Sequence, residues 1–375
     1  LYRVETANIR LNLKGIFQWT ACPAGINGLT PAFHPRPVYG KIGYMNLSDP
    51  ITAATSDQRL AQAYHWLRAL DMDIQSGFHA VAGDASFRRY FRLQVDGQSR
   101  ILMDAPPPGE DVRPFIDVAH RLRSARLNAP EIVHADFENG YLLLEDLGDD
   151  LYRGVLEGSN PESHFPGLFD VLKNMALSVD DDNLPVFDAA MLRSEMDLFP
   201  DWYLGRHRTA MPRAEIDAAW AGFCNQIINS ALDQPQCFVH RDFHSCNLLK
   251  SADNHIGIID FQDAVKGPVS YDFISLIWDR YIHWPRVQIE SWAEMFRLKL
   301  ELQVSPADWL RYCDLMGLQR NIKIVGIFAR LHYRDGKSGY IEMIPRFYDY
   351  VTETLRRYPE FADILSILEQ PKCAP

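Results

Sequence analysis

The chain has 375 residues, of which 47% are hydrophobic and 23% charged, a composition typical of globular proteins and not of disordered or fibrous ones. Its 38 basic and 49 acidic residues give a net charge of −11, which disfavours nucleic acid as a partner. Six cysteines without a CxxC pair disfavour a secreted disulfide framework and a structural zinc site, and favour reduced thiols in the cytoplasm.

Residues 1–44 differ in charge from the rest of the chain. They contain five basic residues and one acidic residue, a net charge of +4, so the remaining residues hold −15. The uncharged stretch Gly15–Pro35 is too polar for a signal-peptide core or a membrane span. Because the chain starts at Leu1 and Met45 precedes the first regular helical pattern, we expect residues 1–44 to be a disordered leader or upstream sequence from a mis-assigned start.

Residues 45–147 are predicted to form a small, mostly antiparallel lobe. A helical repeat begins at Ser56, and a second helix is expected over Val112–Ala125. The pairs Asp96-Gly97 and Asn139-Gly140 are typical of tight hairpin turns. Five strands are expected: Phe78–Val81, Phe87–Val95, Arg100–Met103, Glu131–Phe137 and Tyr141–Leu144.

Helical patterns dominate residues 148–375, which we expect to form a second, larger lobe. The longest helices are predicted over Pro161–Val179, Met191–His207 and Arg213–Leu232. Short strands are predicted over Cys237–Val239, Asn247–Lys250 and Ile256–Asp260. The pattern therefore predicts an α+β protein of two lobes that join near residues 144–148.

One segment of the second lobe contains the residue types that phosphoryl transfer requires. It reads HRDFHSCN over residues 240–247, and an apolar strand that ends in DF follows at residues 258–261. A carboxylate must orient the attacking hydroxyl and accept its proton, and further oxygen ligands must hold Mg²⁺ against nucleotide phosphates. Asp242 fits the first role, and Asn247 and Asp260 fit the second. A hairpin between Asn247 and Asp260 would return both side chains to one pocket.

These loops resemble the catalytic and metal-binding loops of protein kinases and aminoglycoside phosphotransferases. His244, two residues after Asp242, and the YDF element around Asp272 are similar to the aminoglycoside phosphotransferase and choline kinase branch. In that branch the aspartate of the YDF element braces the catalytic loop. Further segments resemble bacterial cell-wall amino-sugar kinases, which phosphorylate the anomeric hydroxyl of N-acetylmuramate or N-acetylglucosamine. These segments are Gly83–Tyr90, Met103–Pro107, Arg193–Tyr203 and Asp260–Ala264.

The resemblance extends over about Ser56–Leu368. It implies a bilobal protein-kinase-like fold, with a five-stranded antiparallel N-lobe that binds nucleotide and a mainly helical C-lobe that binds substrate. The cofactors that it implies are ATP and Mg²⁺. We place His240 with Asp242 among the catalytic residues, where it would brace the loop by hydrogen bonding, and the resemblance implies that Asp272 is a structural brace.

The expected nucleotide side of the site departs from the kinase pattern. Gly83 and Ser86 lie in a loop between two predicted strands, where kinases have a phosphate-covering loop. Only one glycine is present, and a tight turn explains it equally well. The third strand, Arg100–Asp104, contains no lysine for the α- and β-phosphates.

An arginine can take the place of that lysine, since a guanidinium binds phosphate well. Of the three arginines on the second strand we select Arg89, which faces opposite to Arg88 and Arg92. A solvated strand face is the alternative explanation. Glu110 lies where kinases have the glutamate that pairs with the lysine, but as a partner of the helix N-terminus it needs no such role.

Residues 145–147 are expected to be the hinge between the lobes. The backbone of such a hinge binds the edge of adenine, so we assign Glu145 and Leu147 to the nucleotide site. An ordinary loop between lobes would have the same sequence.

The substrate side of the site is less defined in sequence. His244 either braces the loop or approaches substrate. Glu195 and Trp202 lie in a segment that mixes carboxylates with aromatic rings, which suits a sugar, although aromatic residues at helical spacing also pack in cores.

We therefore predict a Mg·ATP-dependent kinase that phosphorylates the anomeric hydroxyl of N-acetylmuramate or N-acetylglucosamine in the cytoplasm. Its sugar 1-phosphate product would pass to a nucleotidyltransferase. One alternative is an aminoglycoside or amino-alcohol phosphotransferase, because an acidic chain attracts polycations. Another is a nucleotide-binding pseudokinase scaffold, which the missing lysine favours. The lactyl carboxylate of muramate would require a nearby cation, with Arg193, Arg206 and Arg208 as candidates.

Overall fold

The computed structural model describes residues 57–81, 87–158, 160–208, 213–251 and 255–369. Contacts divide the chain into Leu1–Asn46 and Leu47–Pro375, and every described residue belongs to the second unit. The predicted leader, and the predicted loop residues Gly83 and Ser86, lie outside the described residues. Among the helices of the described ranges, none combines the length and apolarity needed to cross a bilayer.

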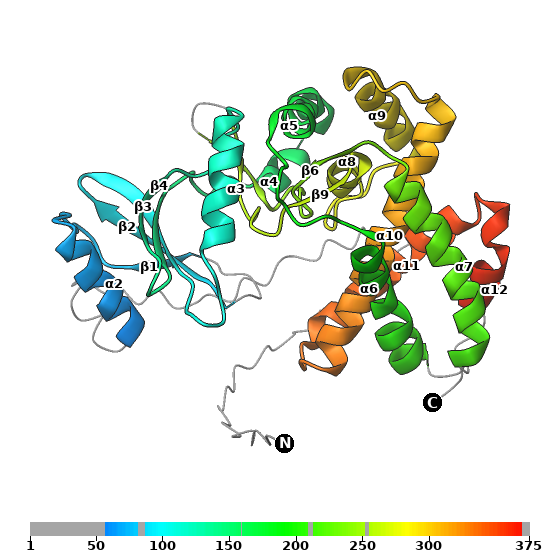
Figure 1. Ribbon diagram of the computed structural model, residues 1–375, viewed down its shortest axis with the longest axis horizontal. Helices are drawn as coiled ribbons and strands as arrows, with labels where there is room; N and C mark the ends of the chain where they lie inside the picture. Colours follow the sequence, from blue (N-terminus) through cyan, green and yellow to red (C-terminus); the bar gives the residue numbers. More distant parts are fainter. Residues whose placement is uncertain (1–56, 82–86, 159, 209–212, 252–254, 370–375) are drawn as a thin grey trace, which may run out of the picture. The chain divides into compact units, whose positions relative to one another are not determined.

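A five-stranded antiparallel sheet forms the N-lobe, as predicted (Figure 1). Its strand order is β1-β2-β3-β5-β4, and Arg89 of β2 lies opposite Asp104 of β3. The hairpin turns at Gly97 and Gly140 both have φ of +74°, a conformation that glycine adopts without strain. The strands are β1 (His79–Val81), β2 (Arg89–Val95), β3 (Gln98–Asp104), β4 (Ile132–Asp136) and β5 (Tyr141–Glu145).

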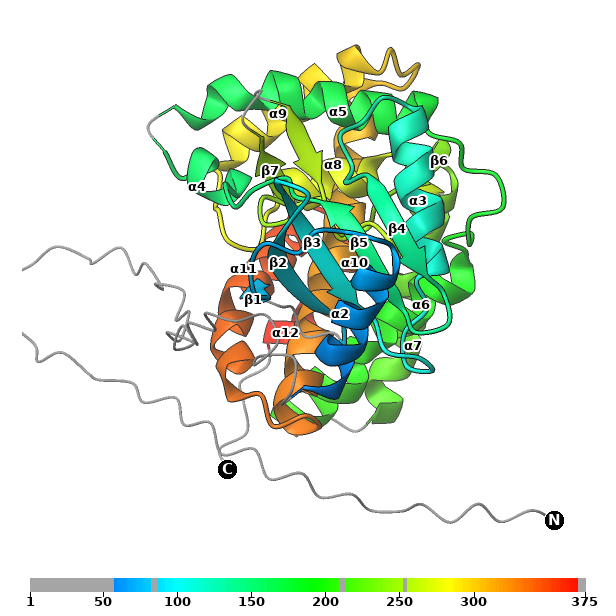
Figure 2. The same cartoon turned by 90° about the vertical axis from the view of Figure 1, so that its left-hand side faces the viewer.

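Alternation along the strands gives the sheet two apolar faces, each covered by one helix. Helix α2 (Gln58–Ala69) packs on Phe91, Leu93 and Leu102, whereas α3 (Arg113–Ser124) lies in the core that contains Met103 and Leu144. Figures 1 and 2 show the two helices on opposite sides of the sheet. The Asp57 carboxylate caps α2 by accepting from the amides of Arg59 and Leu60.

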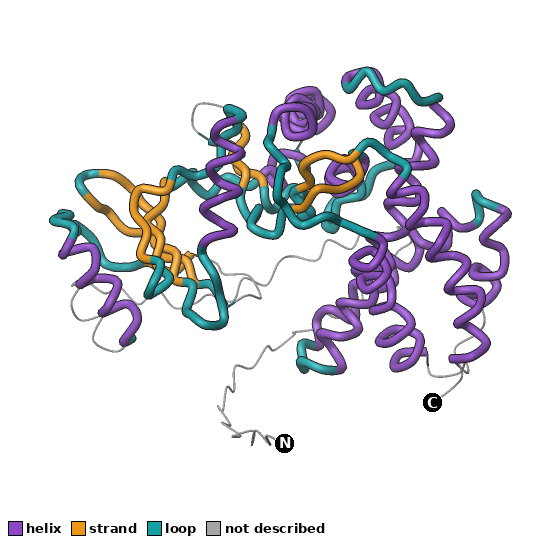
Figure 3. The backbone as a smooth tube through the Cα atoms, in the orientation of Figure 1, coloured by secondary structure: helices purple, strands orange, loops and turns teal. Residues whose placement is uncertain are grey.

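The C-lobe is mainly helical, with two small antiparallel ribbons between the helices (Figure 3). One ribbon pairs β6 (Gln236–Val239) with β9 (Val265–Pro268), and the other pairs β7 (Leu248–Lys250) with β8 (Ile256–Ile258). The sequence did not predict β9, a four-residue strand that ends in Gly-Pro. The α-helices are α4 (Tyr152–Leu156), α5 (Phe165–Ser178), α6 (Ala189–Leu198), α7 (Arg213–Leu232), α8 (Ser270–Ile277), α9 (Arg286–Lys299), α10 (Pro306–Tyr333), α11 (Ile344–Leu355) and α12 (Ala362–Glu369).

The helix predicted over Met191–His207 is wrong in its second half. The α-helical pattern ends at Leu198, and a π-helical stretch, η2 (Phe199–Arg208), follows. Pro200 has no amide hydrogen and so cannot extend the α-helical ladder at this point. Short 3₁₀ turns, which we did not predict, occur at η1 (Pro161–His164), η3 (Ser338–Met343) and η4 (Pro359–Phe361).

The long helix α10 packs against α6, α7, α8, α9 and α11 and is buried along most of its length. Gly326 allows it to approach α6 closely, because a Cβ there would lie 2.5 Å from the Leu198 carbonyl carbon. Polar residues of α10, among them Gln319 and Arg320, therefore reach the interior of the C-lobe.

The two turn glycines differ in their surroundings, which gives a test of the N-lobe packing. A Cβ at Gly140 would lie 2.0 Å from the Ala105 carbonyl oxygen, whereas nothing lies within 4 Å of one at Gly97. We expect Gly97→Ala to lower the free energy of unfolding by about 1 kcal/mol through strain alone. Gly140→Ala should cost at least about 2 kcal/mol more through the clash. If urea denaturation gave the two variants the same loss in free energy of unfolding, this packing would be contradicted.

Candidate active site

The loop between β6 and β7 contains the predicted base, Asp242, and adopts a strained backbone. Arg241 has φ of 76°, and Asp260, after β8, has φ of 64°. Non-glycine residues rarely adopt this conformation, and such strain concentrates at functional sites. The two strained residues therefore mark the two segments that the sequence motif predicted to meet.

The structure brings Asp242, Asn247 and Asp260 together. The Asn247 side-chain amide donates to the Asp242 carbonyl oxygen at 3.0 Å and to the Asp260 carboxylate at 3.3 Å. Gln262 donates to the other Asp260 oxygen at 3.0 Å. Because the Asn247 nitrogen is used in these bonds, its carbonyl oxygen is the atom that could bind a cation beside Asp260.

A buried carboxylate on α8 holds the start of this loop. Asp272 accepts from the backbone amides of His240 at 2.6 Å and Arg241 at 3.0 Å. The His240 ring is fully buried, and its Nε2 donates to the Ile259 carbonyl at 3.0 Å. Burial raises the pKa of Asp272 to about 6, although His240 and the two amide bonds oppose this rise.

A second buried carboxylate, which the sequence did not reveal, holds the end of the loop. Asp279 has no exposed surface and accepts from the amides of Ser245 at 2.8 Å and Tyr281 at 2.7 Å. It lies two residues after the end of α8, so Asp272 and Asp279 act from the two ends of one short helix. The only signal in the sequence was an aspartate at the end of an otherwise apolar stretch.

Asp242 itself forms an ion pair that the sequence did not predict. Arg280 donates to its Oδ1 at 2.6 Å, and the Asp242 side chain is 39% exposed. Burial would raise the pKa of Asp242, but the positive charges of Arg280, Lys323 and Arg320 outweigh burial and hold the pKa well below its usual value. Asp242 is therefore a carboxylate at all physiological pH values.

His244 is buried and neutral. Burial, with the nearby charge of Arg280, holds its pKa well below the usual value. Its Nδ1 accepts from the Cys246 amide at 3.3 Å, so the proton resides on Nε2. The structure thus shows His244 bonded within the loop.

Glu195 lies at the centre of a buried ion cluster. It accepts from Arg241, from Lys323 at 2.8 Å and from Gln319 at 2.8 Å. Burial opposes ionisation, but the charges of Lys323 and Arg241 lower the pKa of Glu195 below its usual value. In the structure the Glu195 oxygens bind these three side chains, and its contact with substrate stays a prediction.

Trp202 is half-buried in η2 and packs against the C-lobe core. The guanidinium of Arg206 lies 5.9 Å from the centre of its ring. Among the described residues, Trp202 forms no hydrogen bond or ring contact with the loop at residues 240–247.

On the nucleotide side, Arg88 and Arg89 face opposite sides of the sheet. Arg89 pairs with Asp57 and Asp104, on the side of α2. Arg88 instead donates to Glu110 at 2.9 Å. Its neighbour Tyr90 has its pKa raised to about 12 by burial, and the charges of Asp260 and Glu110 add to the rise, so this side of β2 lies near the loops described above.

The predicted hinge is held by side chains from the N-lobe. Arg92 forms two hydrogen bonds with Asp146, at 2.6 and 2.9 Å, and also pairs with Asp149. The Glu145 amide donates to the Glu131 carbonyl at 2.9 Å. The Leu147 side chain lies against Gly257 of β8. The structure thus joins this segment to both lobes.

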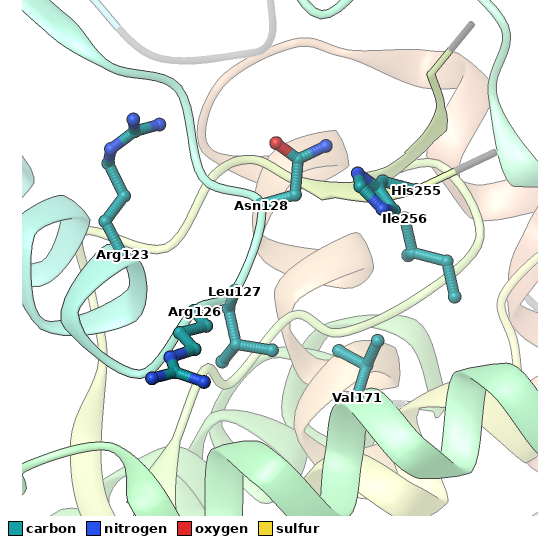
Figure 4. A pocket seen from close by; sticks show the side chains of 7 residues that line it. All are labelled: Arg123, Arg126, Leu127, Asn128, Val171, His255 and Ile256. Carbon is teal, nitrogen blue, oxygen red and sulfur yellow. The ribbon is translucent and has the colours of Figure 1, made fainter. Parts of the chain in front are cut away.

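A pocket of about 390 Å³ opens beside the α3–β4 connection (Figure 4). It is bounded by the α3–β4 connection, α5 and β8, and none of the predicted site residues lines it. Its lining consists of Arg123, Arg126, Leu127, Asn128, Val171, His255 and Ile256. Arg123 points toward Glu145, to which it donates at 3.4 Å.

Within the part of the chain that the structure describes, no three His, Cys, Asp or Glu side chains are grouped to hold a metal. A Mg²⁺ ion in a kinase needs fewer protein ligands, because phosphates and water supply the rest. Asn247 and Asp260 offer oxygen donors of the kind that Mg²⁺ prefers. The residues present therefore fit a magnesium–nucleotide complex but not a metal held by protein alone.

Comparison with known families now adds to this geometry. Residues 77–313 match the phosphotransferase enzyme family. The chain belongs to that family. The solved structures that resemble it include an ADP-bound aminoglycoside phosphotransferase APH(2'')-Ib, at a TM-score of 0.55 and 13% identity, covering 78% of this chain and 97% of that one. Choline kinase LicA from Streptococcus pneumoniae has a TM-score of 0.58 at 11% identity and covers 78% and 98%.

Curated relatives are more similar in sequence. An N-acetylmuramate/N-acetylglucosamine kinase of Pseudomonas aeruginosa is 40% identical over 329 residues, which cover 84% of this chain and 97% of that protein. The enzyme of the same name from Neisseria meningitidis is 34% identical and covers 83% and 95%. The resemblance noted from the sequence is confirmed, and so is the bilobal kinase-like fold. This phosphotransferase is thus an enzyme of the kinase type.

The two bonds to Asp272 predict a pH effect on activity. Protonation near pH 6 removes an acceptor from the His240 or Arg241 amide, so kcat should fall as the pH drops through about 6. Asp272→Asn keeps one acceptor, and we expect kcat to fall about tenfold or more, with the pH-dependent limb lost.

Stability separates this effect from acid unfolding. The pKa of Asp272 is higher in the folded chain than the ordinary 3.8, so the folded state binds this proton more tightly. The contribution of Asp272 to the free energy of unfolding is therefore fully present below pH 3.8 and is lost as the pH rises through about 6. We expect kcat to fall between pH 7 and 5 without a matching fall in melting temperature. Parallel losses of kcat and melting temperature would contradict the bracing role.

Proposed function

We propose that this phosphotransferase transfers the γ-phosphate of ATP to the anomeric hydroxyl of N-acetylmuramate and N-acetylglucosamine. The observation that supports this most strongly is the 40% identity with a kinase of that name over 97% of that protein's length. Three further relatives from other bacteria have the same name, at 30 to 40% identity. The grouping of Asp242, Asn247 and Asp260 is consistent with this reaction.

In this proposal Asp242 orients the sugar hydroxyl. The positive charges near its carboxylate make it a weak base, so it accepts the proton late, after the bond to phosphorus has begun to form. The anomeric hydroxyl is more acidic than an ordinary alcohol, which suits a weak base. His240 contributes by holding the loop, and His244, being neutral, adds no charge to the acceptor site.

We further propose that Asn247 and Asp260 hold Mg²⁺ against the nucleotide phosphates. When bound, the ion would neutralise charge on the phosphoryl group during transfer. Gln262 and Asn247 support this role by holding the Asp260 carboxylate from both sides. Residues 145–147 would bind adenine through their backbone, with Leu147 beside the ring.

For the phosphates, we propose Arg88 in place of Arg89. Arg88 pairs with Glu110 near the start of α3, which is the arrangement that kinases build from lysine and glutamate. Arg89 is paired with two aspartates on the α2 side of the sheet. Arg88 directly precedes β2 and Arg89 begins it, so alternation of the extended chain directs the two side chains to opposite faces.

We also propose that the enzyme works in the cytoplasm and supplies a sugar-1-phosphate nucleotidyltransferase. ATP is available in the cytoplasm, and a sugar 1-phosphate is the substrate that a nucleotidyltransferase requires. The four cysteines of the described residues are free thiols, as expected in a reducing compartment.

A substrate panel tests the proposal. In a coupled ADP assay, the wild-type enzyme should phosphorylate N-acetylmuramate and N-acetylglucosamine but not kanamycin. Asp242→Asn should lower kcat by about 10²–10⁴-fold, because the amide cannot accept the proton. Rapid turnover of kanamycin without sugar turnover would overturn the proposed substrate. ATP binding without turnover of any acceptor would identify a pseudokinase.

Matched substitutions separate the two arginines of the N-lobe. Arg88→Gln should raise the KM for ATP about tenfold or more, because a charged contact with phosphate is lost. Arg89→Gln should instead lower the melting temperature and leave the KM for ATP close to the wild-type value, because its partners join β2 to α2 and β3. A higher KM for ATP in Arg89→Gln alone would reverse the assignment.

A further inference from the structure

Several cations converge on the predicted base. Arg280, Lys323 and Arg320 all lower the pKa of Asp242. Two of them are bound elsewhere, since Lys323 pairs with Glu195 and Arg320 donates to Ser275 at 2.6 Å. Arg280 is the one that bonds directly to the Asp242 carboxylate.

The Arg280 guanidinium is used only in part. Its Nη2 donates to Asp242, while its Nε is buried without a hydrogen-bond partner among the described residues. The Arg280 side chain is 27% exposed and that of Asp242 is 39% exposed, so both are open to solvent. A guanidinium has five N–H donors in a planar fork, and one of them bonds Asp242. Because the Arg280 side chain is partly exposed beside Asp242, a ligand bound at this carboxylate can accept from the remaining donors.

The bond to Arg280 also limits where the acceptor hydroxyl can bind. Arg280 donates to Oδ1 of Asp242, so a sugar hydroxyl that donates to the same carboxylate binds close to the guanidinium. A substituent on the same sugar is then within reach of the guanidinium. N-acetylmuramate differs from N-acetylglucosamine by a lactyl ether that ends in a carboxylate. Arginine binds carboxylates through two parallel hydrogen bonds, which gives both affinity and orientation.

The arginines considered from sequence alone do not offer this contact. Arg193 is paired with Asp197 at 2.9 Å, and Arg206 is exposed beside Trp202. The side chain of Arg208 lies outside the described residues.

We propose that Arg280 is the specificity-determining residue that binds the lactyl carboxylate of N-acetylmuramate while it holds Asp242 in place. This inference rests on the proposed function, because it concerns the choice between the two sugars at the same site. The same cations explain why a polycationic aminoglycoside would be rejected, since it would place like charges beside Arg280, Lys323 and Arg320.

The test compares the two sugars in Arg280→Gln, Arg280→Lys and the matched control Arg320→Gln. The kcat/KM ratio of N-acetylmuramate to N-acetylglucosamine should fall about 10- to 100-fold in Arg280→Gln, mainly through the KM for N-acetylmuramate. Arg280→Lys should retain part of the ratio, because it keeps the charge but not the fork. Arg320→Gln also removes a cation near Asp242, so it should slow both sugars equally and leave the ratio unchanged. An unchanged ratio in Arg280→Gln would overturn the proposal.

A second test removes the charge of the lactyl carboxylate by esterification and uses only the wild-type enzyme. The wild-type enzyme should use the methyl ester of the lactyl group about 10- to 100-fold less well than the free acid. Equal use of acid and ester would overturn the proposal. If Arg280→Gln turns over neither sugar, calorimetry can instead compare how tightly this variant binds N-acetylmuramate and its methyl ester. A variant that binds acid and ester equally supports the assignment, and one that still prefers the acid overturns it.

The two proposals fail in distinguishable ways. If the wild-type enzyme phosphorylates neither sugar, the proposed function is wrong. If it phosphorylates both, but their ratio does not depend on Arg280, only the specificity assignment is wrong.

Discussion

The backbone amides of His240 and Arg241 donate to one buried carboxylate, that of Asp272, and the geometry of the whole candidate site depends on this interaction. The loop that follows lies between short strands and has few ladder bonds of its own, so side chains must satisfy its amides. Asp279 does the same at the far end of the loop. With both ends held, Arg241 can retain its positive φ, and Asp242 is presented beside Asn247 and Asp260.

Charge balance is the second constraint on the site. The acidic chain surrounds its predicted base with cations, and most of these are compensated in turn: Glu195 binds both Arg241 and Lys323. Buried ions that lose their partners are strongly destabilising, which explains why the cluster extends from α6 through the loop to α10. Arg280 differs because its partner is the predicted base, Asp242, and both side chains are partly exposed. The net charge of −11 therefore says little about the local field at the site.

Much of the architecture was accessible from the sequence. The turns at Gly97 and Gly140, with alternating strands around them, predicted the antiparallel sheet, because period-two alternation and turn chemistry are local properties. The loop motif predicted the meeting of Asp242, Asn247 and Asp260 for a similar reason, since a short hairpin joins them. Arg89 was selected for the phosphates from the alternation of one strand alone. Its partners, however, depend on which helix covers each face of the sheet, and this is not visible in the sequence of β2. The second half of the helix predicted over Met191–His207 failed at Pro200, where the hydrogen-bond pattern changes to η2.

The sequence by itself determined the chemistry of the loop, the two-lobed organisation and the family resemblance, because each is encoded by residues close together in the chain. Only the tertiary structure decided which side chains surround Asp242. Arg280 follows α8, while Lys323 and Arg320 lie on α10, some 80 residues beyond the loop, and no local pattern relates them to it. Long-range packing, including the close approach of α10 to α6 at Gly326, brings these helices to the site. The electrostatic environment of the predicted base is therefore a property of the fold and not of the motif.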